Sequence, residues 1–207
     1  MTSPAPLEFG EFYHIFNRGN NREDIFVEER NYGYFLRLAA KHVAPIADIF
    51  AYCLMRNHFH LLVRIKLAEE QETAAQTRRV SETLRVYLMQ PSRQFGHLFN
   101  AYAKAVNKAY ARTGSLFQNP FGRVHVSSDA HFVQLIAYTH QNPQKHGFVR
   151  DFRDWPHSSY HPMIATSPRW LRREGVLEWF GGAAAYRMAH EREVGEALEL
   201  LVPDDPA

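Results

Sequence analysis

The chain has 207 residues, 45% of them hydrophobic, which is enough for one well-buried core and short for two independent domains. Its 24 basic and 22 acidic side chains leave a formal charge of only +2, so an anionic partner must be bound by local clusters. The single cysteine, Cys53, excludes an internal disulfide and fits a reducing compartment. No secretory signal is visible, nor any apolar run of the about 18 residues that a membrane helix needs. We therefore expect a cytoplasmic protein without membrane contact.

The first part of the chain predicts a strand, a helix and a hairpin. Residues 12–17 form a β-prone run that is followed by a polar turn. Apolar residues recur at helical spacing over 29–43. Two strand-like runs, 46–55 and 58–65, are separated by only the two residues 56–57, which predicts a tight antiparallel hairpin.

The middle of the chain predicts one long helix and a fourth strand. The polar segment 66–90 is ambiguous, with a helix expected at 75–88. Ser92 follows a proline and is a suitable N-cap for a helix that should continue to Gly114. The alternating run 121–127 predicts the fourth strand.

A further helix, capped by Asp129, should end near Pro143, because the residue before a proline disfavours helical geometry. The resulting order βαββαβ, followed by this helix, predicts an α+β protein with a ferredoxin-like antiparallel sheet that is covered on one face. Residues 169–200 predict a helical tail. We expect one domain over 1–160 and a tail over 161–207 that is not an independent domain.

His58 and His60 are the first residues with chemical interest. They lie two apart on one predicted strand, so both side chains project from the same face of the sheet. Their Cβ atoms should be roughly 6 to 7 Å apart, which allows both imidazoles to bind one ion. Two hydrogen-bonded histidines on a partly solvated face are the alternative, and the spacing alone does not decide between them.

A metal site needs further donors, and the hairpin supplies no nearby carboxylate. Tyr138 and Asn142 lie four apart on the helix predicted after Asp129 and therefore share one face. Asn142 could supply a carbonyl oxygen to the ion, with Tyr138 one turn away as a nucleophile. An asparagine that only ends a helix, and a tyrosine that is one of ten, are the alternatives.

Basic residues gather on the long predicted helix. Lys104, Lys108 and Arg112 fall at successive i+4 positions and predict a basic ridge, which would suit either phosphate or a solvated helix face. The phosphate-loop, dinucleotide-binding and zinc-peptidase motifs are absent, so we expect no nucleotide cofactor.

Five stretches, taken in order, resemble the REP-associated tyrosine transposases, a group of the single-tyrosine HUH transposases. They are YHIFNRGNNREDIF (13–26), YCLMRNHFHLLV (52–63), GSLFQNPF (114–121), AYTHQNPQKHGFV (137–149) and WPHSSY (155–160). Together they span about residues 9–160, roughly three quarters of the chain. Their ordered agreement is far more specific than any single motif.

The resemblance implies that His58, His60 and Asn142 bind a divalent ion, Mg²⁺ or Mn²⁺, and that Tyr138 is the nucleophile. Proteins of this family cut one strand of hairpin DNA and rejoin it through a 5′-phosphotyrosine link. The expected function is therefore metal-dependent cleavage and rejoining of single-stranded DNA at REP-like hairpins. The expected partner is single-stranded or hairpin DNA, and a homodimer is left open.

Six basic residues are expected to contact DNA: Lys104, Lys108, Arg112, Arg123, Arg18 and Arg56. Arg56 is a departure, since relatives often have proline at this turn; we expect altered loop geometry or an extra phosphate contact there, and no loss of chemistry. The tail after about residue 165 lies outside the resemblance.

Three other functions compete with this interpretation. A domesticated relative would bind hairpin DNA without cutting it, although the complete set of four site residues argues against lost activity. An RNA-recognition module would need an aromatic motif on its central strands that is absent here. A metal nuclease without a covalent intermediate would keep cutting after Tyr138→Phe.

Overall fold

The computed structural model describes residues 6–71, 90–166 and 168–191. One four-stranded sheet has the order β2-β3-β1-β4, and every neighbouring pair is antiparallel. Its strands are β1 (Phe12–Arg18), β2 (Ala47–Met55), β3 (His58–Ile65) and β4 (Gly122–Val126). This order is the ferredoxin-like arrangement, so the predicted fold class is confirmed.

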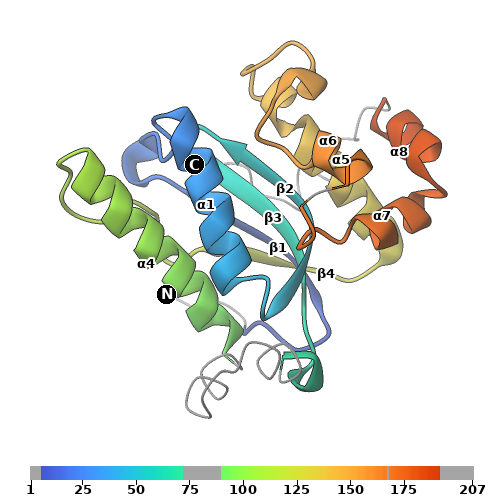
Figure 1. Ribbon diagram of the computed structural model, residues 1–207, viewed down its shortest axis with the longest axis horizontal. Helices are drawn as coiled ribbons and strands as arrows, with labels where there is room; N and C mark the ends of the chain where they lie inside the picture. Colours follow the sequence, from blue (N-terminus) through green and yellow to red (C-terminus); the bar gives the residue numbers. More distant parts are fainter. Residues whose placement is uncertain (1–5, 72–89, 167, 192–207) are drawn as a thin grey trace.

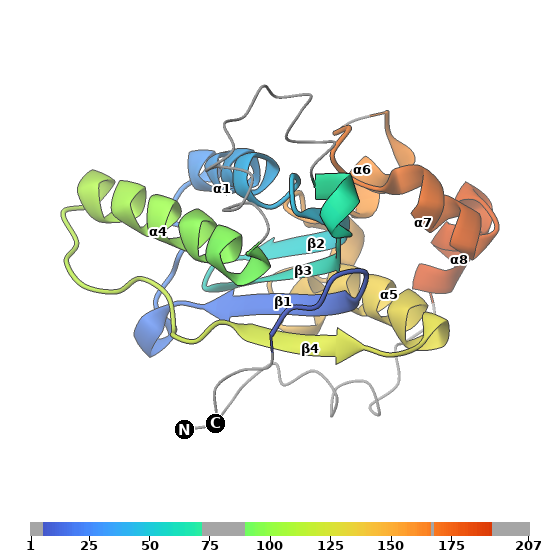
Figure 2. The same ribbon diagram turned by 90° about the horizontal axis from the view of Figure 1, so that it is seen from below.

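Helices cover both faces of the sheet (Figures 1 and 2), whereas the sequence analysis expected one covered face. On one face lie α1 (Glu29–His42) and α4 (Pro91–Ala109), and on the other lies α5 (Asp129–Lys145). The physical reason lies in β2, which is at one edge of the sheet and is nevertheless buried at every position, so both of its faces need cover. Shorter elements include η1 (Asn20–Arg22), η2 (Phe152–Asp154), α6 (Tyr160–Ile164), α7 (Arg173–Phe180) and α8 (Ala183–His190).

Aromatic packing fixes the orientation of β3. The ring centroid of Phe59 lies 4.8 Å from that of Phe35 in α1 and 5.6 Å from that of Phe99 in α4. Phe59 is fully buried, and truncation of such a ring typically costs about 3 to 5 kcal/mol. Because alternate residues on a strand face opposite ways, His58 and His60 must then point to the face that α5 covers.

The hairpin turn at 56–57 forms as predicted and is held by the chain after β1. The backbone N–H groups of Ile25 and Phe26 both donate to the Arg56 carbonyl, at 2.8 and 2.9 Å. The N–H of Gly19 donates to the Asn57 carbonyl at 2.8 Å. A Cβ at Gly19 would lie 2.1 Å from the Glu23 carbonyl oxygen, so this crossing requires glycine.

The predicted bounds of the long helix were wrong at both ends. α4 has Gln90 as its N-cap and Pro91 in its first turn, where the missing N–H of proline costs nothing, so Ser92 already lies inside the helix. The helix ends at Ala109, because Ala111 takes a positive φ of 49°. Arg112 therefore lies beyond the helix and does not continue a ridge of helical positions.

The bounds of α5 also differ from the prediction. Ser128, and not Asp129, is the N-cap, and its Oγ accepts a bond from the His131 N–H at 3.2 Å. The helix continues through Pro143 to Lys145. Only one backbone donor is lost at the proline, and the His146 N–H still reaches the Asn142 carbonyl at 2.9 Å.

The predicted tail contains α7 and α8, which are separated by Gly181 and Gly182 with φ of 81° and 106°. Val176 of α7 and Tyr186 of α8 are buried in the same core as the sheet. The predicted helix at 75–88 and the end of the predicted tail lie outside the described residues. Among the described helices, none is both long enough and apolar enough to cross a membrane.

Candidate metal and tyrosine site

Two buried histidines form the base of the site. His58 and His60 of β3 are 4% and 1% exposed, and their ring centroids lie 5.2 Å apart in an edge-to-face arrangement. The Nδ1 of His58 lies 2.6 Å from Asn57 Oδ1. An amide oxygen only accepts hydrogen bonds, so the proton of a neutral His58 belongs on Nδ1 and its lone pair on Nε2.

A third histidine, His14 of β1, supports the pair and was not anticipated from the sequence. Its Nε2 lies 2.9 Å from His60 Nδ1, and the two rings stack at 5.0 Å with planes 9° apart. Burial lowers the pKa of His14 to about 3. Burial, followed by the charges of neighbouring histidines and Arg18, lowers the pKa of His60 far below its usual value. Both imidazoles are therefore neutral near pH 7, which is the form that binds metals.

Two proton arrangements satisfy the contact between His14 and His60. In the first, His60 Nδ1–H donates to His14 Nε2, and the lone pair of His60 is on Nε2. In the second, His14 donates, and His60 Nε2 carries the proton. Only the first arrangement makes His60 Nε2 a metal ligand, and a hydrogen bond from the other ring nitrogen is the usual support of a ligating histidine.

α5 carries Tyr138 and Asn142 one turn apart, and His146, the C-cap residue of this helix, follows at the same spacing. The Tyr138 ring lies edge-on to His60 at 6.4 Å, and the His146 ring lies edge-on to His58 at 5.1 Å, both between centroids. Asn142 lies one turn from each and therefore between them along the helix. His146 was not anticipated either, although it continues the i+4 spacing of Tyr138 and Asn142.

The carboxamide of Asn142 is completely buried, and neither Oδ1 nor Nδ2 has a hydrogen-bond partner among the described residues. A buried polar group without a partner costs about 1 to 3 kcal/mol, and an ion or a water often explains such a group. Two neutral imidazoles and this carboxamide oxygen fit a divalent ion.

The ligand set contains no carboxylate. In the described part of the chain, no three His, Cys, Asp or Glu side chains form a group that could hold a metal ion. Any ion at His58, His60 and Asn142 would thus lack a negative ligand from the described residues, and a hard cation such as Mg²⁺ would need further oxygen donors. A phosphate group would supply both oxygen and charge.

Tyr138 is fully buried, with no exposed surface. The Nζ of Lys145, nearly two turns further along α5, lies 4.8 Å from the centre of its ring. The phenol is thus beside the histidine pair, but its hydroxyl must become accessible before it can contact a DNA phosphate.

The predicted DNA contacts divide between the two faces of the sheet. Arg18 is opposite His58 in the register of β1 and β3, and its charge contributes to the lowered pKa of His60, so it lies at the site. Lys104 and Lys108 are exposed on α4, which covers the opposite face. Arg123 also faces α4, with one guanidinium nitrogen 3.1 Å from Ser92 Oγ.

The other two predicted DNA contacts, Arg56 and Arg112, lie in ion pairs. Arg56, on the hairpin turn, is 3.1 Å from Asp24, and both side chains are partly exposed. Arg112 contacts Glu23 and donates to Asn107 Oδ1 at 2.9 Å. Each arginine would have to exchange an acidic partner for phosphate in order to bind DNA.

Comparison with known proteins finds similarity both in sequence and in structure, while no protein-family model matches the chain. A protein of Haemophilus influenzae, named "Putative REP-associated tyrosine transposase", is 26% identical over 114 residues, which are 55% of this chain and 59% of that relative. The chain thus aligns with about three fifths of this curated relative. A solved structure of a REP-associated tyrosine transposase bound to a REP hairpin matches with a TM-score of 0.52 and 16% identity, over 81% of this chain and 88% of the other. The resemblance is confirmed on both counts: the chain is similar in sequence to a REP-associated tyrosine transposase and has the fold of another.

Proposed function

We propose that the protein cuts and rejoins single-stranded DNA beside a hairpin, through a covalent link between Tyr138 and a 5′ phosphate. The observation that carries this proposal is the contact of the Tyr138 ring with His60, together with the buried carboxamide of Asn142 one turn further along α5. The similarity to REP-associated tyrosine transposases supports it.

In this reaction the Tyr138 oxygen attacks phosphorus, a new O–P bond forms, and the bond to the leaving 3′ oxygen breaks. The phenolic proton has to leave during attack, because an ordinary tyrosine pKa is near ~10. A divalent ion, held by His58 Nε2, His60 Nε2 and Asn142 Oδ1, would polarise the phosphoryl oxygen and stabilise the leaving group when bound. Arg18 is placed to neutralise phosphate charge.

The linkage to Tyr138 conserves the energy of the broken phosphodiester, so rejoining needs no nucleotide hydrolysis. Attack by the freed 3′ hydroxyl on the phosphotyrosine restores a phosphodiester and returns the phenol. This balance agrees with the lack of nucleotide-binding motifs in the sequence.

The α4 face offers a surface for the DNA backbone and for bases. A cavity of about 580 Å³ lies between α4 and residues 114–121, and Lys104 lines it together with several amide side chains. These amides include Asn17, Asn100, Asn107 and Asn119. Lysine contacts with phosphate give affinity without sequence preference, whereas amides can read base edges. We assign the hairpin to this face.

A second candidate function is hairpin binding without cleavage, and the complete burial of Tyr138 favours it. In that case the fold would bind DNA while the phenol stayed in the core. The two functions differ in one observable, the covalent protein–DNA product.

The test is to incubate the protein with hairpin DNA that carries single-stranded flanks and a label at its 3′ end, in Mn²⁺, and to separate the products on a denaturing gel. Wild type should give a labelled band at the size of protein plus DNA, and Tyr138→Phe should lose it completely. Tyr34→Phe, on α1 at the opposite face, is the matched control and should keep it. Cleavage without a covalent band would indicate a hydrolytic nuclease, and binding without cleavage would indicate the non-catalytic function.

The proposal keeps three expectations from the sequence: a domain boundary at residue 160, a cytoplasmic location, and either a monomer or a homodimer. The packing of Val176 and Tyr186 in the common core supports a tail that is not an independent domain.

A further inference from the structure

A second cavity lies on the same sheet face as the candidate site, toward the other end of the strands. Its volume is about 730 Å³, and α7 forms one wall. Phe12 is two residues from His14 on β1, and Arg64 is four from His60 on β3, so both share the face of the histidines. The strand rise places Arg64 about 13 Å from His60.

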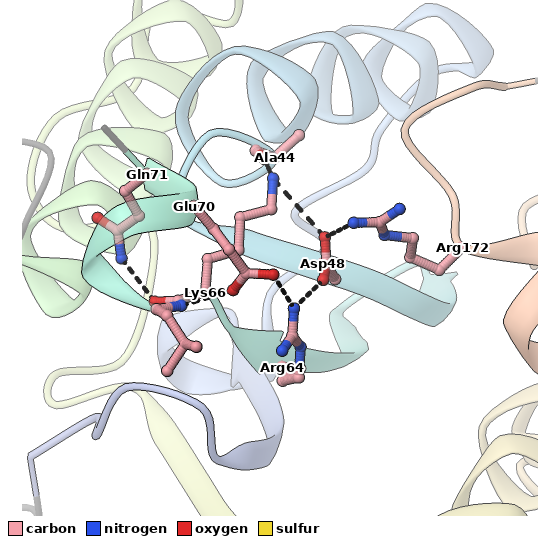
Figure 3. A network of polar contacts seen from close by, with 8 residues as sticks. Ala44, Asp48, Arg64, Lys66, Glu70, Gln71 and Arg172 are labelled. Carbon is pink, nitrogen blue, oxygen red and sulfur yellow. Dashed lines mark hydrogen bonds and ion pairs between the residues drawn. The ribbon is translucent and has the colours of Figure 1, made fainter. Parts of the chain in front are cut away.

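The floor of this cavity is an ionic network around Asp48, which is only 5% exposed. Figure 3 shows Asp48 between Arg64, Lys66 and Arg172. Its carboxylate oxygens lie 2.7 Å from Arg64, 2.8 Å from Arg172 and 3.6 Å from Lys66. Burial raises the pKa of Asp48, but the bonds from Arg172 and Arg64 outweigh it and lower the pKa overall. The carboxylate is therefore ionised and holds two arginines in fixed positions.

The cavity is positively charged even after this pairing. Four arginines line it, Arg64, Arg169, Arg172 and Arg173, against the acids Asp48 and Glu174 of the lining and Glu70, which lies 2.7 Å from Arg64. One guanidinium nitrogen of Arg172 contacts Asp48, but the side chain is 54% exposed. Its other N–H donors are therefore available to a ligand from solvent. A planar guanidinium of this kind suits phosphate.

Aromatic rings also line the cavity. Trp179 of α7 is 46% exposed, and its ring stacks on Phe50 at 5.5 Å with planes 22° apart. Phe132 of α5 meets the same indole edge-on at 4.6 Å. A supported, exposed indole beside arginines is the combination that binds unstacked bases of single-stranded nucleic acid.

We propose that this arginine–tryptophan cavity binds one nucleotide of the single-stranded DNA that flanks the cleavage site. Arg169 and Arg172 contact its phosphate, and Trp179 stacks on its base. The proposal rests on the proposed function for the identity of the ligand. A base paired in a duplex cannot offer its face to the indole, so the cavity selects the single-stranded flank and not the hairpin stem.

The position of the cavity agrees with this assignment. Phe132, which packs on Trp179, precedes Tyr138 by six residues of the same helix, or about 9 Å along its axis. A strand whose phosphate reaches Tyr138 can therefore reach the cavity within a few nucleotides. The cavity volume is in the range of sites that hold a single small ligand.

The test measures binding in a Tyr138→Phe background, so that it does not depend on cleavage. Two fluorescent hairpins are compared by anisotropy, one blunt and one with a four-nucleotide single-stranded flank. Arg169→Glu should weaken binding of the flanked hairpin by about tenfold, the loss of one charged phosphate contact. The blunt hairpin should bind unchanged. Trp179→Ala should show the same selectivity.

Arg187→Glu on α8 makes the same charge change at an exposed position outside the cavity and should affect neither hairpin. Thermal unfolding of each variant checks that the fold is intact. The proposal is overturned if Arg169→Glu weakens both hairpins equally, or if it weakens neither. A failed covalent assay with selective loss of flank binding would refute the proposed cleavage and leave the cavity assignment standing.

Discussion

At the scale of single residues, the least expected feature is the support that His60 receives from His14. The two side chains meet only because β1 and β3 are neighbours and His14 is opposite Leu62 in their register. Spacing within one segment identifies His58 and His60 as a pair, but it contains no information on which strand lies beside them. His146 differs, because its i+4 relation to Asn142 was visible in the sequence.

His14→Phe tests this support. The substitution keeps a ring of similar size and removes the nitrogen that lies 2.9 Å from His60 Nδ1. Loss of such a partner typically weakens metal binding by about 10 to 100-fold, and we expect a change in that range. The measurement is Mn²⁺ titration by electron paramagnetic resonance with hairpin DNA present, in the Tyr138→Phe background.

The control for this substitution is His125→Phe on β4, which removes an exposed imidazole that bonds Glu11 at 2.8 Å. It should leave Mn²⁺ affinity unchanged. Equal Mn²⁺ affinity in the His14 variant and wild type would show that His14 only fills space.

At the scale of elements, buried polar contacts join α5 to α8 of the C-terminal tail. His140 Nδ1 lies 2.8 Å from His190 Nε2, and His140 Nε2 lies 2.6 Å from Ser159 Oγ. Gln141 donates to the His190 carbonyl at 2.8 Å. Since α5 carries Tyr138 and Asn142 as well, α8 helps to fix the helix that positions the site.

This contact predicts a loss of stability in mild acid. Burial lowers the pKa of His190 from 6.5 to about 4, while its backbone bond to Tyr186 acts in the opposite direction. The unfolded chain then binds a proton at His190 at a higher pH than the folded chain does. The free energy of unfolding should therefore fall as pH decreases from about 6.5 to about 4, by at most about 3 kcal/mol from this residue.

Urea unfolding of wild type and His190→Gln across that pH range measures the effect. The variant should be less stable at pH 7, and its stability should depend less on pH. His161→Gln, an exposed histidine on α6, should retain the slope of wild type. Parallel profiles for His190→Gln and wild type would exclude His190 as the source.

The sequence predicted which segments are helices and which are strands. It predicted less well where each element ends and which faces of the sheet the helices cover. The four strands and the order βαββαβ follow from runs of apolar and β-branched residues between turns. Pro143 was wrongly taken as a helix end, because a proline removes only one donor and α5 has enough contacts to continue past it. The sequence of β2 did indicate that helices cover both faces of the sheet, because its apolar residues form a continuous run and do not alternate with polar ones.

At the scale of the whole molecule, the sheet separates the two parts of the proposed function, DNA binding and cleavage. The histidines, Tyr138 and the arginine–tryptophan cavity lie on the α5 face, while Lys104 and Lys108 lie on α4 across the sheet. A mutation on α4 should therefore change the affinity for DNA without changing the rate of the cleavage step. This separation could not be read from the sequence, because it depends on which helix covers which face.

Lys108→Glu tests the separation. Lys108 is exposed, and phosphate contacts of this kind contribute an affinity that depends on salt and not on sequence. We expect all hairpin targets to bind more weakly by a similar factor, and the slope of log affinity against log salt to fall by about one. At saturating DNA the covalent product should form at the rate of wild type.

Lys41→Glu, equally exposed at the end of α1, is the matched control and should bind as wild type does. Selective loss of one target sequence would show that Lys108 contacts a base, and a slower covalent step at saturation would show that the two faces are coupled.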